Sequence, residues 1–394
     1  MAAPRVIGAE HVEGARARGR IRMEILPGDI VTDMARETAA RLGVTLIDGP
    51  LEAPVRPRTD GATAARRTLY RRSPRWTAPR ASQRREARRF SKIAFVGAGG
   101  VGANAAHLAA QADMAARLTL IDIAPGAAAA TALDLNHAAG ITRSAAVAEG
   151  SERLGDVAGA EVVVVTAGRA RGPGMTRADL LSANRRVIRA AAEAIRTQAP
   201  DAVVIVVTNP LDEITHEMLE ATGFAREKVL GMAGTLDSGR FRAALAKAAG
   251  VPPADVEAMA LGAHGAEMVP VASRARIRGR ALEAFLSAEA IAACVEDAVT
   301  GGGQVVALRR MGSATLAPAH ATVELLDHLR GARAGAVPTS VRLRGEFGIE
   351  GVPLAVPCLL GASGLIEVET PALSDAELAG LRAAAEAIRG RIAS

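Results

Sequence analysis

The glycine run Gly97-x-Gly99-x-x-Gly102 is the feature that most constrains how this chain folds. It follows Lys92–Val96, an apolar stretch typical of a buried strand, and it precedes an Ala-rich segment typical of a helix. In such a unit the first glycine makes the tight turn, the second lets the backbone approach a pyrophosphate, and the third lets helix and strand pack closely. The run therefore predicts a dinucleotide site in a Rossmann fold.

An acidic residue stands where such a site needs one. The predicted strand Leu118–Ile121 runs into Asp122, twenty residues beyond Gly102. Its carboxylate would accept hydrogen bonds from the adenosine ribose hydroxyls and would repel a 2′-phosphate, which favours NAD over NADP. The alternative is a glycine-rich turn that binds no ligand.

The order of apolar segments predicts an α/β fold. The β-branched strands Glu161–Thr166 and Ala202–Thr208 alternate with helical segments, as in a doubly wound parallel sheet covered on both faces. Later segments predict helices over about 282–299 and 319–329 and an α+β substrate domain. The predicted parts are a small N-terminal accessory module (1–50), a disordered Arg/Pro-rich linker (51–90), an NAD-binding Rossmann domain (91–234) and a substrate domain (235–394).

Two loops at the predicted ligand edge of the sheet carry polar side chains. The segment after Thr166 contains Arg171 and Arg177, and guanidinium groups can grip a carboxylate with two hydrogen bonds. Asn209 follows the next strand, before Pro210. Ligands bind outside the carboxyl ends of such strands. The ordinary alternatives are solvated loop arginines and a turn-capping asparagine.

Three further residues form a candidate acid–base group. Asp237 and Arg240 stand three residues apart, on one face of a predicted helix. His264 lies between small residues, where a substrate could approach. Histidine titrates near neutrality, so it suits proton transfer, and a neighbouring carboxylate would fix its tautomer.

Taken in order, these runs resemble the motifs of the lactate/malate dehydrogenase family, most closely its lactate-dehydrogenase-like malate dehydrogenases. The resemblance covers about residues 91–394. It implies a proton-transfer role for His264 with Asp237 as its partner, a grip on the C1 carboxylate by Arg240, polarisation of the carbonyl by Arg177, and recognition of a second carboxylate by Arg171. It also implies NAD contacts at Asn184, Val207 and Asn209, a substrate contact at Asn209, and a pocket-lining role for Gly312–Leu316.

The resemblance implies reversible hydride transfer between malate and NAD, giving oxaloacetate and NADH. The alternatives are a lactate-like dehydrogenase of another 2-hydroxy acid and a non-catalytic NAD-binding scaffold. Departures from the family pattern at Ala170 and Gly172 affect the arginine loop. Ala266 replaces a carboxylate that the family often has two residues after its histidine.

The net charge of +6 belongs to one segment. Residues 51–90 contain twelve arginines and three acidic residues, with spaced prolines, whereas residues 1–50 are balanced. We interpret this segment as a solvated tether. A nucleic-acid-binding segment is the alternative, because Tyr70 and Trp76 stand among the arginines.

Residues 1–50 predict a short strand, a helix capped by Asp29 or Thr32 and closed by Gly43, and a second strand. The helical run weakly resembles segments of bacterial microcompartment proteins, which implies an assembly partner. No metal site or disulfide is expected from Cys294 and Cys358, and no apolar run has the length of a membrane span. We expect a cytoplasmic enzyme, or one inside a microcompartment, and the family implies a homodimer or homotetramer.

Overall fold

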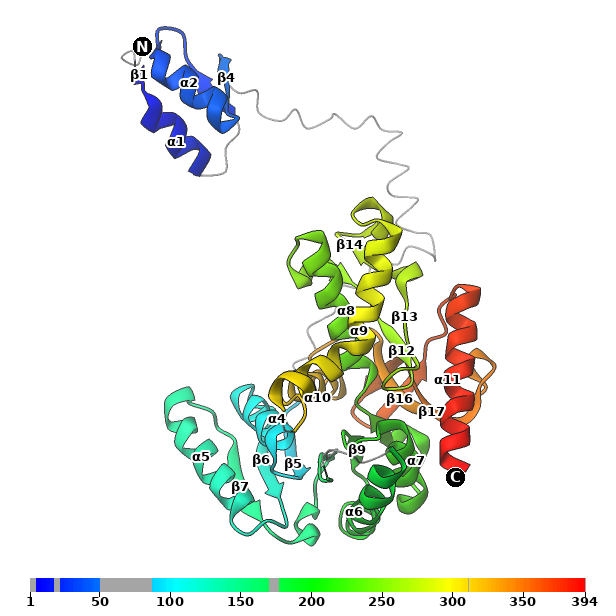
Figure 1. Cartoon of the computed structure of the whole chain (residues 1–394). Helices are drawn as coiled ribbons and strands as arrows, with labels where there is room; N and C mark the ends of the chain where they lie inside the picture. Colours follow the sequence, from blue (N-terminus) through cyan, green and yellow to red (C-terminus); the bar gives the residue numbers. More distant parts are fainter. Residues whose placement is uncertain (1–4, 18–21, 50–86, 170–176, 311, 394) are drawn as a thin grey trace, which may run out of the picture. The chain divides into compact units, whose positions relative to one another are not determined.

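The computed structural model describes residues 5–17, 22–49, 87–169, 177–310 and 312–393. The chain divides into two units, Met1–Ala81 and Ser82–Ser394 (Figure 1). Most of the predicted linker lies outside the described residues. Its last residue, Phe90, already belongs to the first strand of the larger unit and is buried.

The N-terminal unit repeats one strand–helix–strand pattern. Val6 pairs with Ile30 in one parallel pair of strands, and Arg22 pairs with Thr45 in the other. Thr32 caps the second helix, which settles the two candidates for that role, and Gly43 ends it. The elements are β1 (Val6–Ile7), α1 (Ala9–Ala17), β2 (Arg22–Ile25), β3 (Ile30–Val31), α2 (Asp33–Leu42) and β4 (Thr45–Asp48).

A small apolar core holds this unit together. Val12 of α1 and Ala35 and Ala39 of α2 are buried between the helices and strands, with Ile7, Ile25 and Val44. The two helices pack on each other. The unit therefore has a core of its own, built from few and small side chains.

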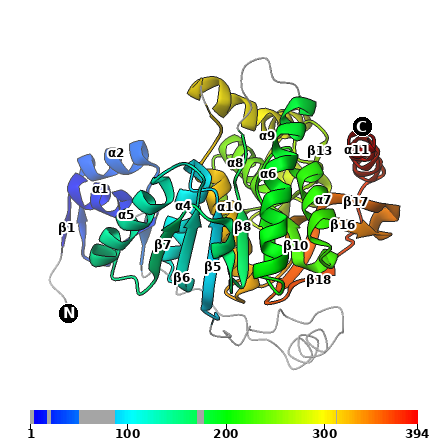
Figure 2. The same ribbon diagram turned by 90° about the horizontal axis from the view of Figure 1, so that it is seen from below.

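The larger unit is built on one mixed sheet. Its parallel part has the order β10-β9-β8-β5-β6-β7, which is the Rossmann order with a switch point between β5 and β8. Figure 2 shows β7, β6, β5, β8 and β10 in this order. The parallel strands are β5 (Phe90–Val96), β6 (Ala115–Ile121), β7 (Val147–Ser151), β8 (Val162–Val165), β9 (Val203–Val206) and β10 (Val229–Gly231).

Antiparallel strands extend the same sheet into the second half of the chain. β16 pairs with β10, and β17, β12 and β13 follow, so most strands of that half belong to the main sheet. The α/β class and the doubly wound parallel sheet are confirmed, while the domain division at residue 234 stays a prediction. These strands are β12 (Ala260–Gly262), β13 (Met268–Pro270), β16 (Val337–Arg344), β17 (Glu350–Gly361) and β18 (Gly364–Val368), and a small separate sheet has β11 (Val256–Glu257), β14 (Arg276–Ile277) and β15 (Arg280–Ala281).

Helices cover both faces of the parallel strands, which explains why the strands are apolar throughout. Alternate residues of β8 face opposite sides: Val162 and Val164 join one core cluster, whereas Val163 and Val165 join another. α4 and α10 cover the first face, and α6 and α7 cover the second. The helices are α4 (Gly100–Gln111), α5 (Ala127–Thr142), α6 (Arg177–Gln198), α7 (Leu211–Thr222), α8 (Gly234–Ala249), α9 (Ala288–Arg309), α10 (Leu316–Leu329) and α11 (Asp375–Ala393).

α9 differs from the predicted helix at both ends. It begins after the cap Ser287 and continues through three glycines to Arg309, where the sequence predicts an end near residue 299. A Cβ on Gly302 would lie 3.1 Å from a guanidinium nitrogen of Arg240. The glycine that weakens the helix therefore makes room for a residue of the predicted site.

α9 is also, among the described residues, the helix whose length and composition would allow it to cross a membrane. Its 22 residues include Glu296 and Asp297, and the helix packs on α8. Core helices of soluble proteins often have the same length and apolar composition, so these two properties are weak evidence for a membrane span.

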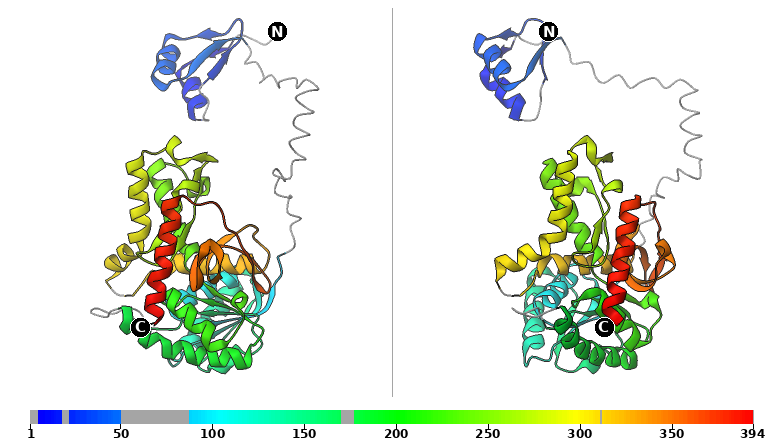
Figure 3. Two further views of the ribbon diagram at one scale, coloured as in Figure 1. Left: turned by 90° about the vertical axis from the view of Figure 1, so that its right-hand side faces the viewer. Right: turned by 45° about the vertical axis from the view of Figure 1, so that its right-hand side comes forward.

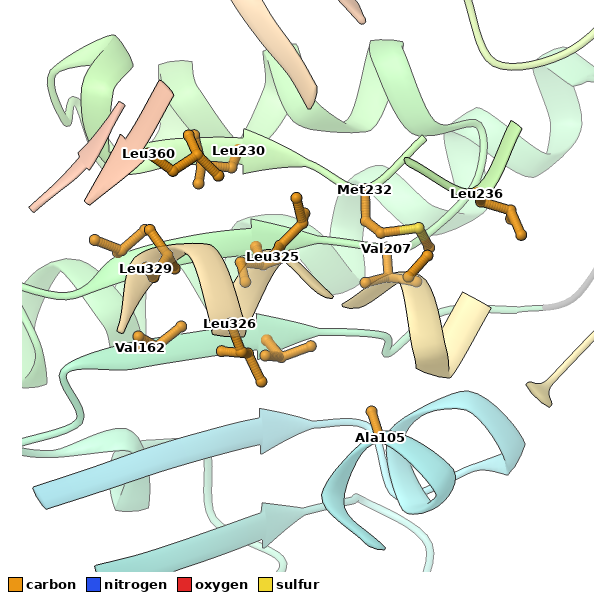
Figure 4. Packing of buried hydrophobic residues seen from close by; sticks show 14 of the residues in the cluster. Ala105, Val162, Val207, Leu230, Met232, Leu236, Leu325, Leu326, Leu329 and Leu360 are labelled. Atoms are coloured by element: carbon orange, nitrogen blue, oxygen red, sulfur yellow. The ribbon is translucent and has the colours of Figure 1, made fainter. Parts of the chain in front are cut away.

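The central helix α10 fills the space over the sheet. Leu325, Leu326 and Leu329 are at most 1 % exposed and face strand residues such as Val162 and Leu230 (Figure 4). In both views of Figure 3, α11 (red) stands against the orange β17. These contacts fix the elements that carry the predicted site.

We predict that Leu325→Ala lowers the free energy of unfolding of the larger unit by about 2–5 kcal/mol, because it leaves a cavity under α10. Leu308→Ala is the matched control, since Leu308 is 85 % exposed and its loss costs at most ~0.5 kcal/mol. Urea unfolding of both variants checks this. Equal effects of the two substitutions would contradict the packing described above.

Candidate active site

A cleft of about 750 Å³ opens at the carboxyl ends of the parallel strands. It extends from the glycine loop at Gly99 to His264, and α9 and α10 border it through residues such as Gly302 and Thr315. The cleft lies at the switch point of the sheet, where doubly wound folds bind their ligands. Several residues predicted from the sequence line it: Gly99, Val207, Asn209, Arg240, His264 and Gly312.

The glycine loop has the geometry that a pyrophosphate needs. A Cβ on Gly97 would lie 2.6 Å from the backbone nitrogen of Ala167, and one on Gly102 would lie 1.9 Å from the carbonyl oxygen of Gly97. Nothing lies within 4 Å of a Cβ position on Gly99, which caps α4 without a side-chain hydrogen bond. Gly97 and Gly102 therefore have no room for a side chain, whereas Gly99, the glycine predicted to lie against the phosphates, faces open space.

Asp122 lies directly beside this loop. Its carboxylate accepts a hydrogen bond of 2.8 Å from the backbone nitrogen of Ala98 and one of 3.0 Å from that of Ala124. The carboxylate therefore has a fixed place at the end of β6, next to the glycines. This arrangement fits the ribose hydroxyls of NAD.

Asn184 lies behind the cleft wall. It is fully buried; its Oδ1 accepts from the backbone nitrogen of Arg169 at 2.7 Å, and its Nδ2 donates to the carbonyl oxygen of Asn209 at 2.6 Å. It thus ties together the loops that follow β8 and β9. Direct contact of Asn184 with the cofactor stays a prediction.

Asp237, Arg240 and His264 form one ionic group. The Nδ1 of His264 lies 2.9 Å from one carboxylate oxygen of Asp237, and a guanidinium nitrogen of Arg240 donates to the other oxygen at 2.9 Å. The side chain of Asp237 is 3 % exposed, whereas those of His264 and Arg240 are 18 % and 20 % exposed. A buried carboxylate therefore holds two groups whose outer ends reach the cleft.

The chain places His264 at the turn of a hairpin. β12 and β13 pair antiparallel, and residues 263–267 connect them. Gly262 has a φ of +87°, a conformation that residues with a Cβ rarely adopt, and it starts the turn. Asp237 comes from the first turn of α8, which packs on β12.

The sequence prediction missed Asp212, which holds the backbone of His264. Asp212 is fully buried in the first turn of α7; it accepts from the backbone nitrogen of His264 at 2.8 Å and from the Ser340 hydroxyl at 2.9 Å. Burial raises the pKa of Asp212 to about 6. In the sequence, the only local signal for Asp212 was its position two residues after Pro210.

The surroundings raise the pKa of His264. Burial lowers it, but the charge of Asp237 and the hydrogen bond to it, together with the charge of Asp212, outweigh burial and the repulsion from Arg240. Because Nδ1 is engaged by Asp237, Nε2 remains for a ligand in the cleft. The group is therefore suited to exchange a proton near neutral pH.

Two of the predicted arginines cannot be placed relative to this group from the described residues. Arg171 lies outside the described residues, and Arg177 is the first residue of α6, of whose side chain nothing is described. Arg169 and Arg309, which the sequence analysis did not select, line the cleft. Among the described residues, no group of three or more His, Cys, Asp and Glu side chains could hold a metal ion.

Comparison with known proteins identifies the family of this fold. The model of the lactate/malate dehydrogenase NAD-binding domain matches residues 91–231, and that of the lactate/malate dehydrogenase α/β C-terminal domain matches residues 234–394. The chain belongs to the lactate/malate dehydrogenase family. As a member of this family it is an NAD-dependent oxidoreductase, and the predicted NAD cofactor is confirmed.

The relatives of this dehydrogenase include malate dehydrogenases and lactate dehydrogenases. It is 40 % identical to the malate dehydrogenase of Nostoc punctiforme over 301 residues, which are 76 % of this chain and 92 % of that protein. The Cryptosporidium parvum malate dehydrogenase matches with a TM-score of 0.75 and 34 % identity, over 77 % of this chain and 98 % of that one. The Cryptosporidium parvum lactate dehydrogenase complexed with lactic acid and NAD matches with a TM-score of 0.74 and 31 % identity, over 77 % of this chain and 96 % of that one.

We predict that Asp237→Asn lowers the turnover of this dehydrogenase by about 10²–10⁴-fold, because the histidine loses the anion that orients and charges it. With His264 as the predicted proton donor, the rate of 2-oxo acid reduction falls as pH rises through the pKa of this group. In Asp237→Asn the pKa of His264 is lower, so the decrease in rate occurs at a lower pH. The pH profile of kcat/KM checks this, and an unshifted profile would contradict it.

Proposed function

We propose that this protein is an NAD-dependent malate dehydrogenase, which interconverts malate and oxaloacetate. The observation that carries the proposal is that the glycine loop, the buried Asp237–His264 pair and Arg240 lie around one cleft. The relatives from Nostoc punctiforme and Caulobacter vibrioides, 40 % and 38 % identical, are both malate dehydrogenases and support this substrate over lactate.

His264 moves the proton in this proposal. In malate oxidation its Nε2 takes the proton of the C2 hydroxyl, and in oxaloacetate reduction it returns that proton. Asp237 keeps Nδ1 protonated and stabilises the imidazolium that forms. NAD, when bound, supplies the acceptor for the hydride that leaves C2.

The arginines bind the rest of the substrate. Arg240 keeps one edge of its guanidinium on Asp237 and turns other donors to the C1 carboxylate in the cleft. Asn209 contacts substrate and cofactor from the end of β9. We assign polarisation of the carbonyl to Arg177. We assign recognition of the second carboxylate to Arg171, which makes it the residue that separates a dicarboxylate from a monocarboxylate.

The cofactor is held mainly by the first part of the chain. Gly97, Gly99 and Gly102 shape the pyrophosphate loop, Asp122 receives the adenosine ribose, and Val207 lies under the nicotinamide end. Asn184 acts on this side through the loops that it ties together. We therefore propose that 91–234 binds NAD and that 235–394 supplies the acid–base pair.

We predict that the protein oxidises NADH faster with oxaloacetate than with pyruvate. Arg171→Gln lowers kcat/KM for oxaloacetate by about 10²-fold, because a carboxylate loses a charged hydrogen-bond partner, and it changes the value for pyruvate only a few-fold. Steady-state kinetics with a panel of 2-oxo acids checks both statements.

The other outcomes of this panel identify other proteins. A wild type that prefers pyruvate is a lactate-like dehydrogenase of another 2-hydroxy acid. A wild type that binds NADH and turns over no 2-oxo acid is a non-catalytic NAD-binding scaffold. Arg196→Gln is a suitable control, because Arg196 pairs with Glu193 on the exposed side of α6.

We further propose that the dehydrogenase is a homodimer or homotetramer. Large apolar side chains are exposed on α5 (Leu133, Ile141) and at the start of α10 (Leu316), at 57–85 % exposure. A second copy of the chain would cover such surfaces. We place the protein in the cytoplasm, which suits the two free, buried cysteines, Cys294 and Cys358.

For the N-terminal unit we propose an assembly role, with a microcompartment protein as the partner. Its separate core and the exposed apolar side chains of Val6, Ile30 and Met34 support a docking module more than a part of the enzyme.

We predict that residues 82–394 alone keep the turnover of the full chain and the same number of subunits, which light scattering of the purified protein checks.

We also predict that residues 1–50, fused to a fluorescent protein, direct it into a larger particle. Fluorescence microscopy in a host that makes microcompartments checks this. A diffuse reporter would refute the assembly role, and a monomeric 82–394 would refute the oligomer.

A further inference from the structure

A second ionic group lies beside the catalytic hairpin. Arg391, near the end of α11, donates from Nε to Glu213 at 2.6 Å and from Nη1 to Glu267 at 2.8 Å. The side chain of Glu213 is 1 % exposed, that of Arg391 is 25 % exposed and that of Glu267 is 34 % exposed. One guanidinium thus joins the first turn of α7 to the turn of the hairpin.

The two carboxylates neighbour residues of the active site. Glu213 follows Asp212, which binds the backbone nitrogen of His264, and Glu267 stands three residues after His264 in the same turn. The hairpin is therefore attached to α7 by two parallel links. One is the Asp212 hydrogen bond, and the other is the bridge through Arg391.

The helix that carries Arg391 is fixed in place. Its buried residues Leu381, Ala384 and Ile388 pack toward the sheet, and a Cβ on Gly380 would lie 3.2 Å from Val269 of β13. Figure 1 shows the C-terminal end of α11 beside α7. The guanidinium thus sits on a rigid element, which is what a positioning contact requires.

We propose that Glu267 is a positioning residue for His264, acting through Arg391. The bridge keeps the turn closed against α7, so that His264 Nδ1 stays 2.9 Å from Asp237. This inference rests on the proposed role of His264 as the proton-transfer residue.

Glu267 acts on His264 through the position of the turn and not through its charge. Asp237 and Arg240 face the imidazole from α8, and Asp212 faces it from α7. Glu267 directs its carboxylate to Arg391 instead. Its loss should therefore act by loosening the turn and not by removing a charge from the imidazole.

The test compares Glu267→Gln with the wild-type full chain. Glu267 is partly exposed, so the variant keeps its fold, whereas Arg391→Met would leave the buried Glu213 without this partner. Hydrogen exchange measures the opening of the hairpin at the backbone amide of His264. Exchange of a strand β9 amide reports global stability in the same sample.

We expect the His264 amide to exchange about tenfold faster in Glu267→Gln, with unchanged exchange in β9. In the same variant kcat should fall about 3–10-fold with little change in KM, because a looser turn misplaces the acid–base group without removing a substrate contact. Glu386→Gln, the same substitution at an exposed carboxylate of α11 that pairs with Arg389, should change neither quantity.

Unchanged exchange at His264 in Glu267→Gln would overturn the proposal, and so would equal acceleration in the hairpin and in β9. The exchange result does not depend on turnover. If the wild type turned over no 2-oxo acid, the proposed function would fail while the positioning contact could still be confirmed or refuted.

Discussion

The site depends on one buried carboxylate. Asp237 is almost fully buried, and its charge is stable there only because both oxygens have cationic or polar donors, one on His264 and one on Arg240. The same two contacts orient the proposed proton-transfer group and the proposed substrate-binding group. Binding and acid–base chemistry are therefore coupled through a single side chain.

The fold brings these three residues together from two elements of the second half of the chain. α8 begins after the last parallel strand and carries Asp237 and Arg240 in its first two turns. The hairpin of β12 and β13 joins the same sheet through β17 and presents His264 in its turn. The cofactor loop lies at the switch point of the parallel strands, so both halves open into one cleft.

Local patterns in the sequence predicted much of this. The glycine run, Asp122 and the three-residue spacing of Asp237 and Arg240 are short-range signals, and the structure places each of them at or beside the cleft. The contacts that could not be predicted join residues far apart in the sequence: Asp212 with Ser340, and Glu267 with Arg391. The continuation of α9 through its glycines was also missed, because the Arg240 side chain that lies against Gly301 and Gly302 comes from another helix.

The most direct test of the central claim is an NMR titration of the His264 imidazole in the protein without ligands, assigned by comparison with His264→Asn. We expect a pKa above the usual ~6.5 for histidine, because the Asp237 and Asp212 carboxylates outweigh burial. A pKa at or below that value would show that Asp237 does not hold the histidine as described, and it would contradict the account.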